Sequence, residues 1–115
     1  MKKIGCLLLC VMLLLMGGCS TKETSDKKKV LIGSSPDFPP FESLNAQGEI
    51  EGFEVDMMNW ILDYLNKDEE VYEFEWKQMS FDTIVSAVAT DQIDLGVSGF
   101  TYDPERDVLF SDAFY

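Results

Sequence analysis

The sequence predicts an α/β domain with a mostly parallel sheet flanked by helices. Three observations lead to this fold class. Short apolar or alternating segments typical of strands occur three times, amphipathic segments typical of helices occur twice, and the two kinds alternate along the chain. Such alternation calls for parallel strands joined by right-handed crossovers. The 115 residues allow one domain of this kind at most.

The first half of the body predicts a strand, a loop and a helix. Residues 30–33 form a short apolar run, which suits a strand buried on both faces. The prolines of "SSPDFPPF" exclude regular structure in the next segment. "NAQGEIEG" then predicts a turn at Gly48 and an extended piece. In residues 53–66 apolar side chains recur every four positions, which predicts an amphipathic helix with Glu54 in its first turn.

The second half predicts a strand, a helix and a further strand. "VYEFEWK" alternates strictly between apolar and charged side chains, as in a strand with one face in water. Ser80 is the candidate N-cap of the helix that follows. Residues 93–97 predict the third strand, and "DPER" predicts a turn opening a short helix with Pro104 near its start. Both tryptophans, Trp60 and Trp76, are expected to pack inside.

Residues 1–18 have the layout of a secretory signal peptide, with two lysines, a short apolar run and a pair of glycines. The cysteine that follows, Cys19, resembles the lipid-attachment residue of bacterial lipoproteins; the alternative is a plain signal peptide cleaved nearby. Residues 19–29 are polar and predict a flexible tether, which leaves residues 30–115 as the folded lobe. Because all three cysteines precede the body, no disulfide is expected there.

The composition is strongly acidic, with 21 acidic residues, nine basic residues and a net charge of −12. Two of the nine basic residues and none of the acidic ones lie in the predicted leader, so its removal leaves seven against 21 and a net charge of −14. Such a surface repels nucleic acid and anionic lipid. We therefore expect no nucleic-acid partner, and we assign any membrane attachment to the lipid.

The candidate site follows from topology, because ligands of open α/β sheets bind beyond the carboxyl ends of the strands. Three loops leave those ends. Their candidate ligand-binding residues are Phe38, Phe81, Ser98, Gly99, Thr101 and Arg106. Arg106 is the only arginine, and a guanidinium matches a carboxylate with two parallel hydrogen bonds. The glycine allows close backbone approach, the hydroxyls add donors, and the rings can hold an aliphatic chain or a cation.

Plainer interpretations remain open for each of these residues. Arg106 lies among the acids of "DPERD", where an ordinary surface ion pair would account for it. Phe38 and Phe81 would also fit in the core. The runs "KDEE" and "EIEGFE" are interpreted as solvated faces rather than as metal ligands or a catalytic pair, so we expect no metal and no cofactor. Histidine is absent from the chain, which argues against an enzyme.

Five segments together resemble the bacterial extracellular solute-binding proteins of polar amino-acid ABC transporters, family 3. They are "PDFPPFE", "GFEVDMMNWI", "SFDTIVSAV", "DQIDLGVSGFTYDPERD" and "FSDAFY". The resemblance covers residues 30–115. It implies a periplasmic-binding-protein-like fold whose two lobes close on an amino acid, here present as the first lobe only, in an apparently truncated sequence. It also implies an extracytoplasmic protein that is not an enzyme and delivers an amino acid to ABC permease subunits; the lipid expected at Cys19 would anchor it to the cell membrane, at the outer face or in the periplasm.

The resemblance also assigns roles to residues. It implies that Arg106 grips the α-carboxylate of the ligand, that the small residues before it lie around the same end, and that Phe38 and Phe81 contact the ligand. Ser35 stands where many relatives have an acid, which puts a contact to the ligand amine from that position in doubt. Without the second lobe the chain would carry half a site.

Two other classes of function remain open. One is a binding-protein-like domain of a larger enzyme, such as a lytic transglycosylase or a dehydratase. The other is the ectodomain of a signalling receptor. A glycosidase-like domain downstream would favour the first and a membrane-spanning helix downstream would favour the second, although a lipidated N-terminus would already supply an anchor.

Overall fold

The computed structural model describes residues 26–115. The predicted signal peptide, Cys19 and most of the predicted tether lie outside these residues. Within the described part, no helix combines the length and the apolar character needed to cross a membrane.

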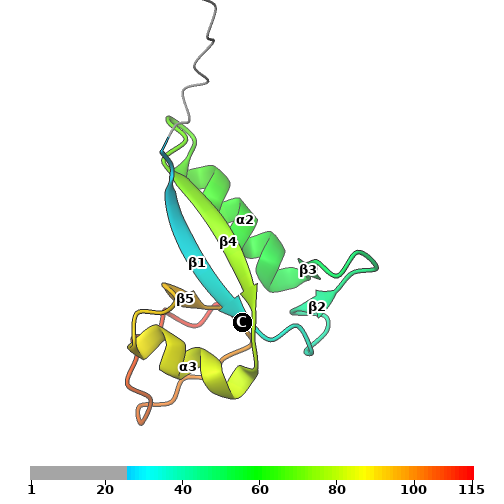
Figure 1. The fold of residues 1–115 in the computed structure, drawn as a ribbon, viewed down its shortest axis with the longest axis vertical. Coiled ribbons are helices and arrows are strands. Elements are labelled where there is room, and N and C mark those ends of the chain that lie inside the picture. The colour runs from blue at the N-terminus through cyan, green and yellow to red at the C-terminus, as the bar shows by residue number, and fades with distance from the viewer. Residues whose placement is uncertain (1–25) are drawn as a thin grey trace, which may run out of the picture.

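A three-stranded parallel sheet in the order β4-β1-β5 forms the centre of the lobe (Figure 1). The middle strand, β1 (Lys28–Ser34), pairs along its whole length with β4 (Tyr72–Gln78). On its other side it pairs over two residues with β5 (Leu95–Gly96). The predicted α/β fold with a parallel sheet is therefore confirmed.

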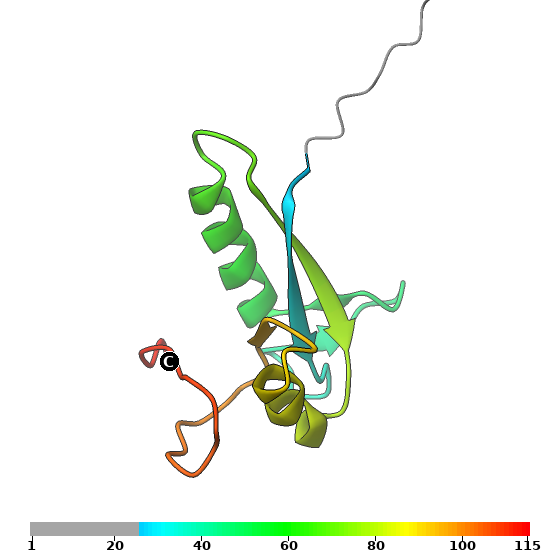
Figure 2. The same cartoon turned by 60° about the vertical axis from the view of Figure 1, so that its left-hand side comes forward.

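Two helices and a small hairpin surround the sheet. The helix α2 (Phe53–Leu65) runs beside β4, and α3 (Phe81–Ala89) lies against β5 and β1 (Figures 1 and 2). Strands β2 (Ser43–Leu44) and β3 (Ile50–Glu51) form an antiparallel hairpin that leads into α2. Both helices lie where the periodicity predicts them, and the hairpin turns at the predicted Gly48, whose φ is 78°.

The core lies between α3 and the sheet. Its buried apolar residues are Ile84, Ala87 and Ile93, with Leu31, Met79, Val88 and Phe100 packed against them. Two strand glycines allow the close contact. A Cβ added at Gly33 would stand 2.5 Å from Ile93 Cδ1, and one at Gly96 would stand 2.6 Å from Ile84 Cγ2. The absence of side chains at these two positions lets the isoleucines pack directly on the strand backbones.

The first strand is longer than predicted and includes the last two residues of the segment predicted to be a tether. Lys28 and Lys29 belong to β1, where they pair with the first two residues of β4. The Nζ of Lys29 lies 2.7 Å from Glu75 Oε2 on the neighbouring strand. Hydrogen bonds from Lys29 and Lys77 lower the pKa of Glu75 to about 2. The ladder to β4 and these ion pairs extend the strand into a segment whose composition alone predicts a flexible chain.

The predicted short helix at "DPER" is wrong, because the structure has a turn there. Asp103 closes the turn in two ways. Its Oδ1 accepts a hydrogen bond from the Glu105 amide at 3.0 Å, and its carbonyl accepts one from the Arg106 amide at 3.2 Å. A side chain that bonds to nearby backbone in this way competes with helix formation. The third strand is also shorter than the predicted 93–97.

The prediction that Trp60 packs inside is wrong as well. Its exposed fraction is 70%, and its ring stacks on Tyr64 one helical turn further on, with a centroid distance of 6.2 Å. The buried side of α2 carries Val55 and Met58 instead. Trp76 is partly buried on β4.

Candidate ligand-binding site

The carboxyl ends of the three parallel strands meet at one edge of the sheet, as the predicted topology requires (Figure 1). Hydrogen bonds tie the loops that leave this edge to one another. The Ser35 amide donates to Ser98 Oγ at 3.0 Å, and the Met79 amide donates to the Ser34 carbonyl at 2.9 Å. These bonds give the edge a fixed local shape on which a site can be built.

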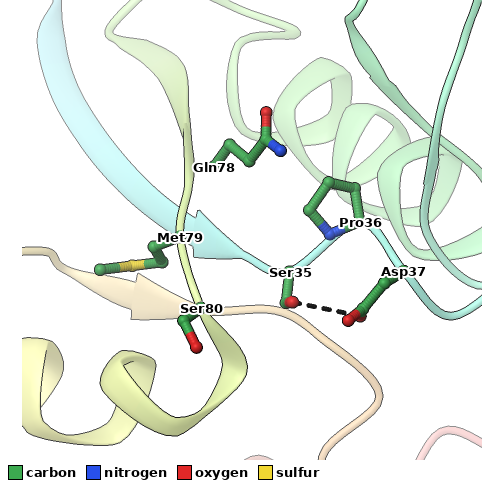
Figure 3. A pocket seen from close by; sticks show the side chains of 6 residues that line it. All are labelled: Ser35, Pro36, Asp37, Gln78, Met79 and Ser80. Atoms are coloured by element: carbon green, nitrogen blue, oxygen red, sulfur yellow. Dashed lines mark hydrogen bonds between the residues drawn. The ribbon is translucent and has the colours of Figure 1, made fainter.

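A hollow of about 480 Å³ opens at this edge (Figure 3). It is lined by Ser35, Pro36, Asp37, Gln78, Met79 and Ser80. The Ser35 hydroxyl and the Asp37 carboxylate point toward one another, and the hydroxyl donates a hydrogen bond of 3.1 Å. One carboxylate, several neutral polar groups and no basic side chain line this hollow, so it favours a positively charged group. A second hollow of about 410 Å³, the amino-end hollow, lies at the end of β4 away from this edge. Its lining includes Tyr72, the first residue of β4, and Asn66, which follows α2.

Phe38 and Phe81 both keep exposed surface at the edge, with exposed fractions of 52% and 36%. Phe38 stacks on Phe41 at a centroid distance of 5.3 Å. Phe81 stacks on Phe100 at 4.8 Å. A ring held by stacking on one face and open to solvent on the other is suited to contact a ligand at low entropic cost.

The Arg106 side chain lies over Phe100, with its Cζ 5.4 Å from the ring centroid. Phe81, Phe100 and Arg106 therefore follow one another in a stack. The guanidinium also has Nη1 at 3.5 Å from the Thr101 carbonyl and Nε at 3.6 Å from Asp103 Oδ2. The long, partly exposed pair with Asp103 is of the kind that contributes about 0–1 kcal/mol, so a ligand carboxylate can replace it.

Ser98 and Gly99 are used inside the protein in this structure. Ser98 is buried, and its hydroxyl donates to Glu42 Oε1 at 3.0 Å. The Gly99 amide donates to both carboxylate oxygens of Glu54, at 2.9 Å and 3.1 Å. Thr101 is exposed. The predicted contacts of these three residues with a ligand stay predictions; what the structure adds is that Ser98 and Gly99 anchor the segment that carries Arg106.

Glu42 and Glu54 were not among the predicted site residues, yet both are almost fully buried, with exposed fractions of 1% and 3%. The interpretation of "EIEGFE" as a solvated face is wrong for Glu54. Helical spacing offered a signal, because Glu54 lies four residues before Met58 and so shares the buried face of α2. For Glu42 no comparable periodic signal exists, since it lies in a loop.

The environment of Glu42 strongly favours its neutral form. Burial, and after it the neighbouring Glu54 carboxyl, raise the pKa of Glu42 to about 8, while the hydrogen bond from Ser98 acts in the opposite direction. Oε2 of Glu42 is buried and has no donor among the described residues, which fits an oxygen that carries a proton.

The fold and the site define a class of protein: an α/β lobe whose carboxyl edge carries a basic group, a hollow with one carboxylate, and partly exposed aromatic rings. The chain belongs to the bacterial extracellular solute-binding proteins, family 3, whose profile matches residues 30–115. The predicted family is thereby confirmed.

Two curated relatives are binding proteins from Bacillus subtilis. The arginine-binding extracellular protein ArtP is 35% identical over 86% of this chain and 37% of its own length. The L-cystine-binding protein TcyJ is 34% identical over 90% of this chain and 38% of its own length. Both are named as binding proteins rather than enzymes, and this chain spans less than two fifths of either one.

Among solved structures, a point mutant of the arginine-bound form of domain 1 of the T. maritima ArgBP is similar to this chain. The identity is 36%, the TM-score is 0.66, and the match covers 76% of this chain and 65% of that one. The described lobe therefore has the fold of a first domain in this family.

Proposed function

We propose that this protein is the extracytoplasmic substrate-binding component of an amino-acid ABC transporter and that it captures a cationic amino acid of the arginine type. The observation that carries the proposal is the placement of Arg106, Phe38, Phe81 and the Asp37 hollow on one edge of a lobe whose relative, domain 1 of the T. maritima ArgBP, is described as arginine-bound. The arginine-binding ArtP supports the same ligand class.

In the proposed complex, Arg106 exchanges Asp103 for the α-carboxylate of the ligand. Each hydrogen bond between such charged groups contributes about 1.5–3 kcal/mol. The Thr101 hydroxyl offers a further donor at the same end. Phe38 and Phe81 hold the aliphatic part, and the cationic end of the side chain turns toward Asp37. A cation over an aromatic ring adds about 0.5–2 kcal/mol.

The first lobe alone is expected to bind measurably. The arginine-bound domain 1 from T. maritima supports this, because it is a single lobe of the same fold. We expect one lobe, as half a site, to bind the ligand more weakly than a closed two-lobed site, since only one side of the ligand is enclosed.

Attachment and partners form the rest of the proposal. Lipidation of Cys19 would hold the lobe at the outer face of the cell membrane or in the periplasm, with permease subunits as the receiving partners. The support is the leader sequence, with its basic start, apolar run and small residues before the cysteine. Mass spectrometry of the membrane fraction would detect a diacylglyceryl-modified Cys19, and an unmodified N-terminus after cleavage elsewhere would reject the anchor.

Titration calorimetry with an amino-acid panel tests the ligand class. We expect L-arginine and L-lysine to bind about tenfold or more tightly than L-glutamate, because a side-chain carboxylate would face Asp37 on a strongly acidic surface. L-Argininamide, which lacks the carboxylate, is the matched control and should lose most of the affinity. No heat with any of these compounds, or a preference for glutamate, would reject the proposal.

A further inference from the structure

Two buried carboxyl groups from different elements meet at the turn that leads to Arg106. Glu42 comes from the loop between β1 and β2, and Glu54 comes from the first turn of α2. Glu42 Oε1 accepts a hydrogen bond from Ser98 Oγ at 3.0 Å, and Glu54 accepts the Gly99 amide with both oxygens, at 2.9 Å and 3.1 Å. The two acids thus hold consecutive residues of one turn.

Backbone hydrogen bonds also connect the two segments that carry Glu42 and Glu54. The amides of Phe53 and Glu54 at the start of α2 donate to the carbonyls of Pro40 and Phe41, each at 3.0 Å. Gly99 has a φ of 60°, in the left-handed region, and a Cβ there would stand 2.8 Å from Phe38 Cδ1. The turn therefore sits in a fixed place between α2, the loop of Glu42 and the ring of Phe38.

Two neighbouring carboxyls are not both ionised in a site closed to water, because neither water nor a cation is there to offset their repulsion. The groups that face Glu42 are the Glu54 carboxyl from α2, the Asp37 carboxylate from its own loop and the Ser98 hydroxyl from the segment after β5. None of them carries a positive charge. A single proton shared by the two carboxyls would remove the conflict, and the otherwise unpartnered Oε2 of Glu42 is the oxygen available to carry it.

We propose that Glu42 and Glu54 form a proton-sharing clamp that holds the Ser98–Gly99 turn and thereby positions the Thr101–Arg106 segment for the ligand. Both are positioning residues, since they act on the ligand only through the turn. The part that concerns ligand binding rests on the proposed function; the clamp itself does not.

The clamp makes the site sensitive to alkaline pH. The folded-state pKa of Glu42 is raised from 4.5 to about 8. The stabilisation by the protonated Glu42 carboxyl is therefore complete below about pH 4.5 and is lost as the pH rises to about 8. When the proton leaves, the two carboxylates repel each other and the turn loosens. Arginine affinity should fall over the upper part of the same range.

The test is the pH profile of arginine binding for the wild type, Glu42→Gln and the exposed control Glu51→Gln. A glutamine amide can donate to Glu54 as the protonated carboxyl does. We expect the wild type and the control to lose affinity about tenfold between about pH 6.5 and pH 9, with a midpoint near the pKa of Glu42, while Glu42→Gln loses much less. Dividing the wild-type dissociation constant by that of the variant cancels the titration of the ligand amine. Parallel profiles for wild type and Glu42→Gln would overturn the proposal.

A second readout does not need a ligand. In the wild-type protein, the carbon-13 resonance of the Glu42 carboxyl and the amide resonance of Gly99 should shift together with a midpoint near pH 8. Such a joint shift supports the clamp even if no amino acid binds, in which case only the proposed function fails. A carboxyl midpoint near the ordinary 4.5, or a Gly99 amide that does not follow it, overturns the clamp whether or not the variant folds.

Discussion

Alanine in place of Arg106 is expected to weaken L-arginine binding by about a hundredfold or more. The guanidinium would form two charge-assisted hydrogen bonds with the ligand carboxylate, each contributing about 1.5–3 kcal/mol, and about 1.4 kcal/mol corresponds to a factor of ten. The fold should survive, because the side chain is partly exposed and its pair with Asp103 is long, at 3.6 Å. Calorimetry on the purified variant measures the effect, with circular dichroism as the check on folding.

Three comparisons make this result specific. Arg106→Lys keeps the charge without the planar fork and should recover only part of the affinity. Lys67→Ala removes an exposed cation at the end of α2 and should bind like the wild type. L-Argininamide should bind the wild type and Arg106→Ala with similar weakness, because it offers the arginine no carboxylate. A folded Arg106→Ala protein that binds L-arginine normally would contradict the assignment.

Alanine in place of Gly52 is expected to reduce the free energy of unfolding by about 3 kcal/mol or more. Gly52 precedes α2 with φ 133° and ψ −175°, a conformation open essentially to glycine alone. A Cβ there would stand 2.4 Å from the Phe41 carbonyl oxygen and 2.9 Å from that of Pro40. Those two carbonyls accept the first amides of α2, so the loop cannot move aside without losing these hydrogen bonds.

Gly48→Ala is the matched control for this prediction. Gly48 also has a positive φ, of 78°, but a Cβ there meets nothing within 4 Å. Its replacement should cost about 1 kcal/mol, from backbone strain alone. Urea unfolding of the three proteins measures the difference. Equal unfolding midpoints for the two variants would show that the contact between Gly52 and the loop does not constrain the fold, whereas loss of cooperative unfolding in Gly52→Ala alone agrees with the prediction.

The regular elements with a clear period could be predicted from the sequence. The four-residue spacing within residues 53–66 and the alternation of "VYEFEWK" place α2 and β4 correctly, because each element buries one face and the period indicates that face. The parallel direction of the strands followed from the alternation of strands and helices along the chain. The carboxyl edge as the place of the candidate site followed in turn from the topology.

Features that depend on contacts between distant residues could not be predicted in the same way. Lys28 and Lys29 look like tether until β4 offers them a partner strand. Trp60 looks like core, yet it shares the outer face of α2 with Tyr64. The "DPER" segment looks like a helix start, yet Asp103 bonds to the local backbone and holds a turn.

The candidate site also contains some residues that the sequence predicts and others that it does not. Sequence and topology predict Phe38, Phe81 and Arg106 at one edge, and the structure has Phe38 and Arg106 on loops that leave that edge and Phe81 at the start of α3. It also shows that Phe100, which was not predicted, is the ring over which Arg106 lies. The buried acids Glu42 and Glu54 escaped prediction because a charged residue is normally solvated, and only the tertiary structure shows what encloses them.

The central claim is that an amino acid binds at the carboxyl edge of the parallel sheet, and backbone amide shifts during an L-arginine titration test it most directly. The account predicts saturable shifts at Phe38, Phe81, Gly99 and Arg106, with little change at Asn66 and Tyr72 beside the amino-end hollow. Shifts confined to the amino-end hollow, with the carboxyl edge unchanged at saturation, would contradict it.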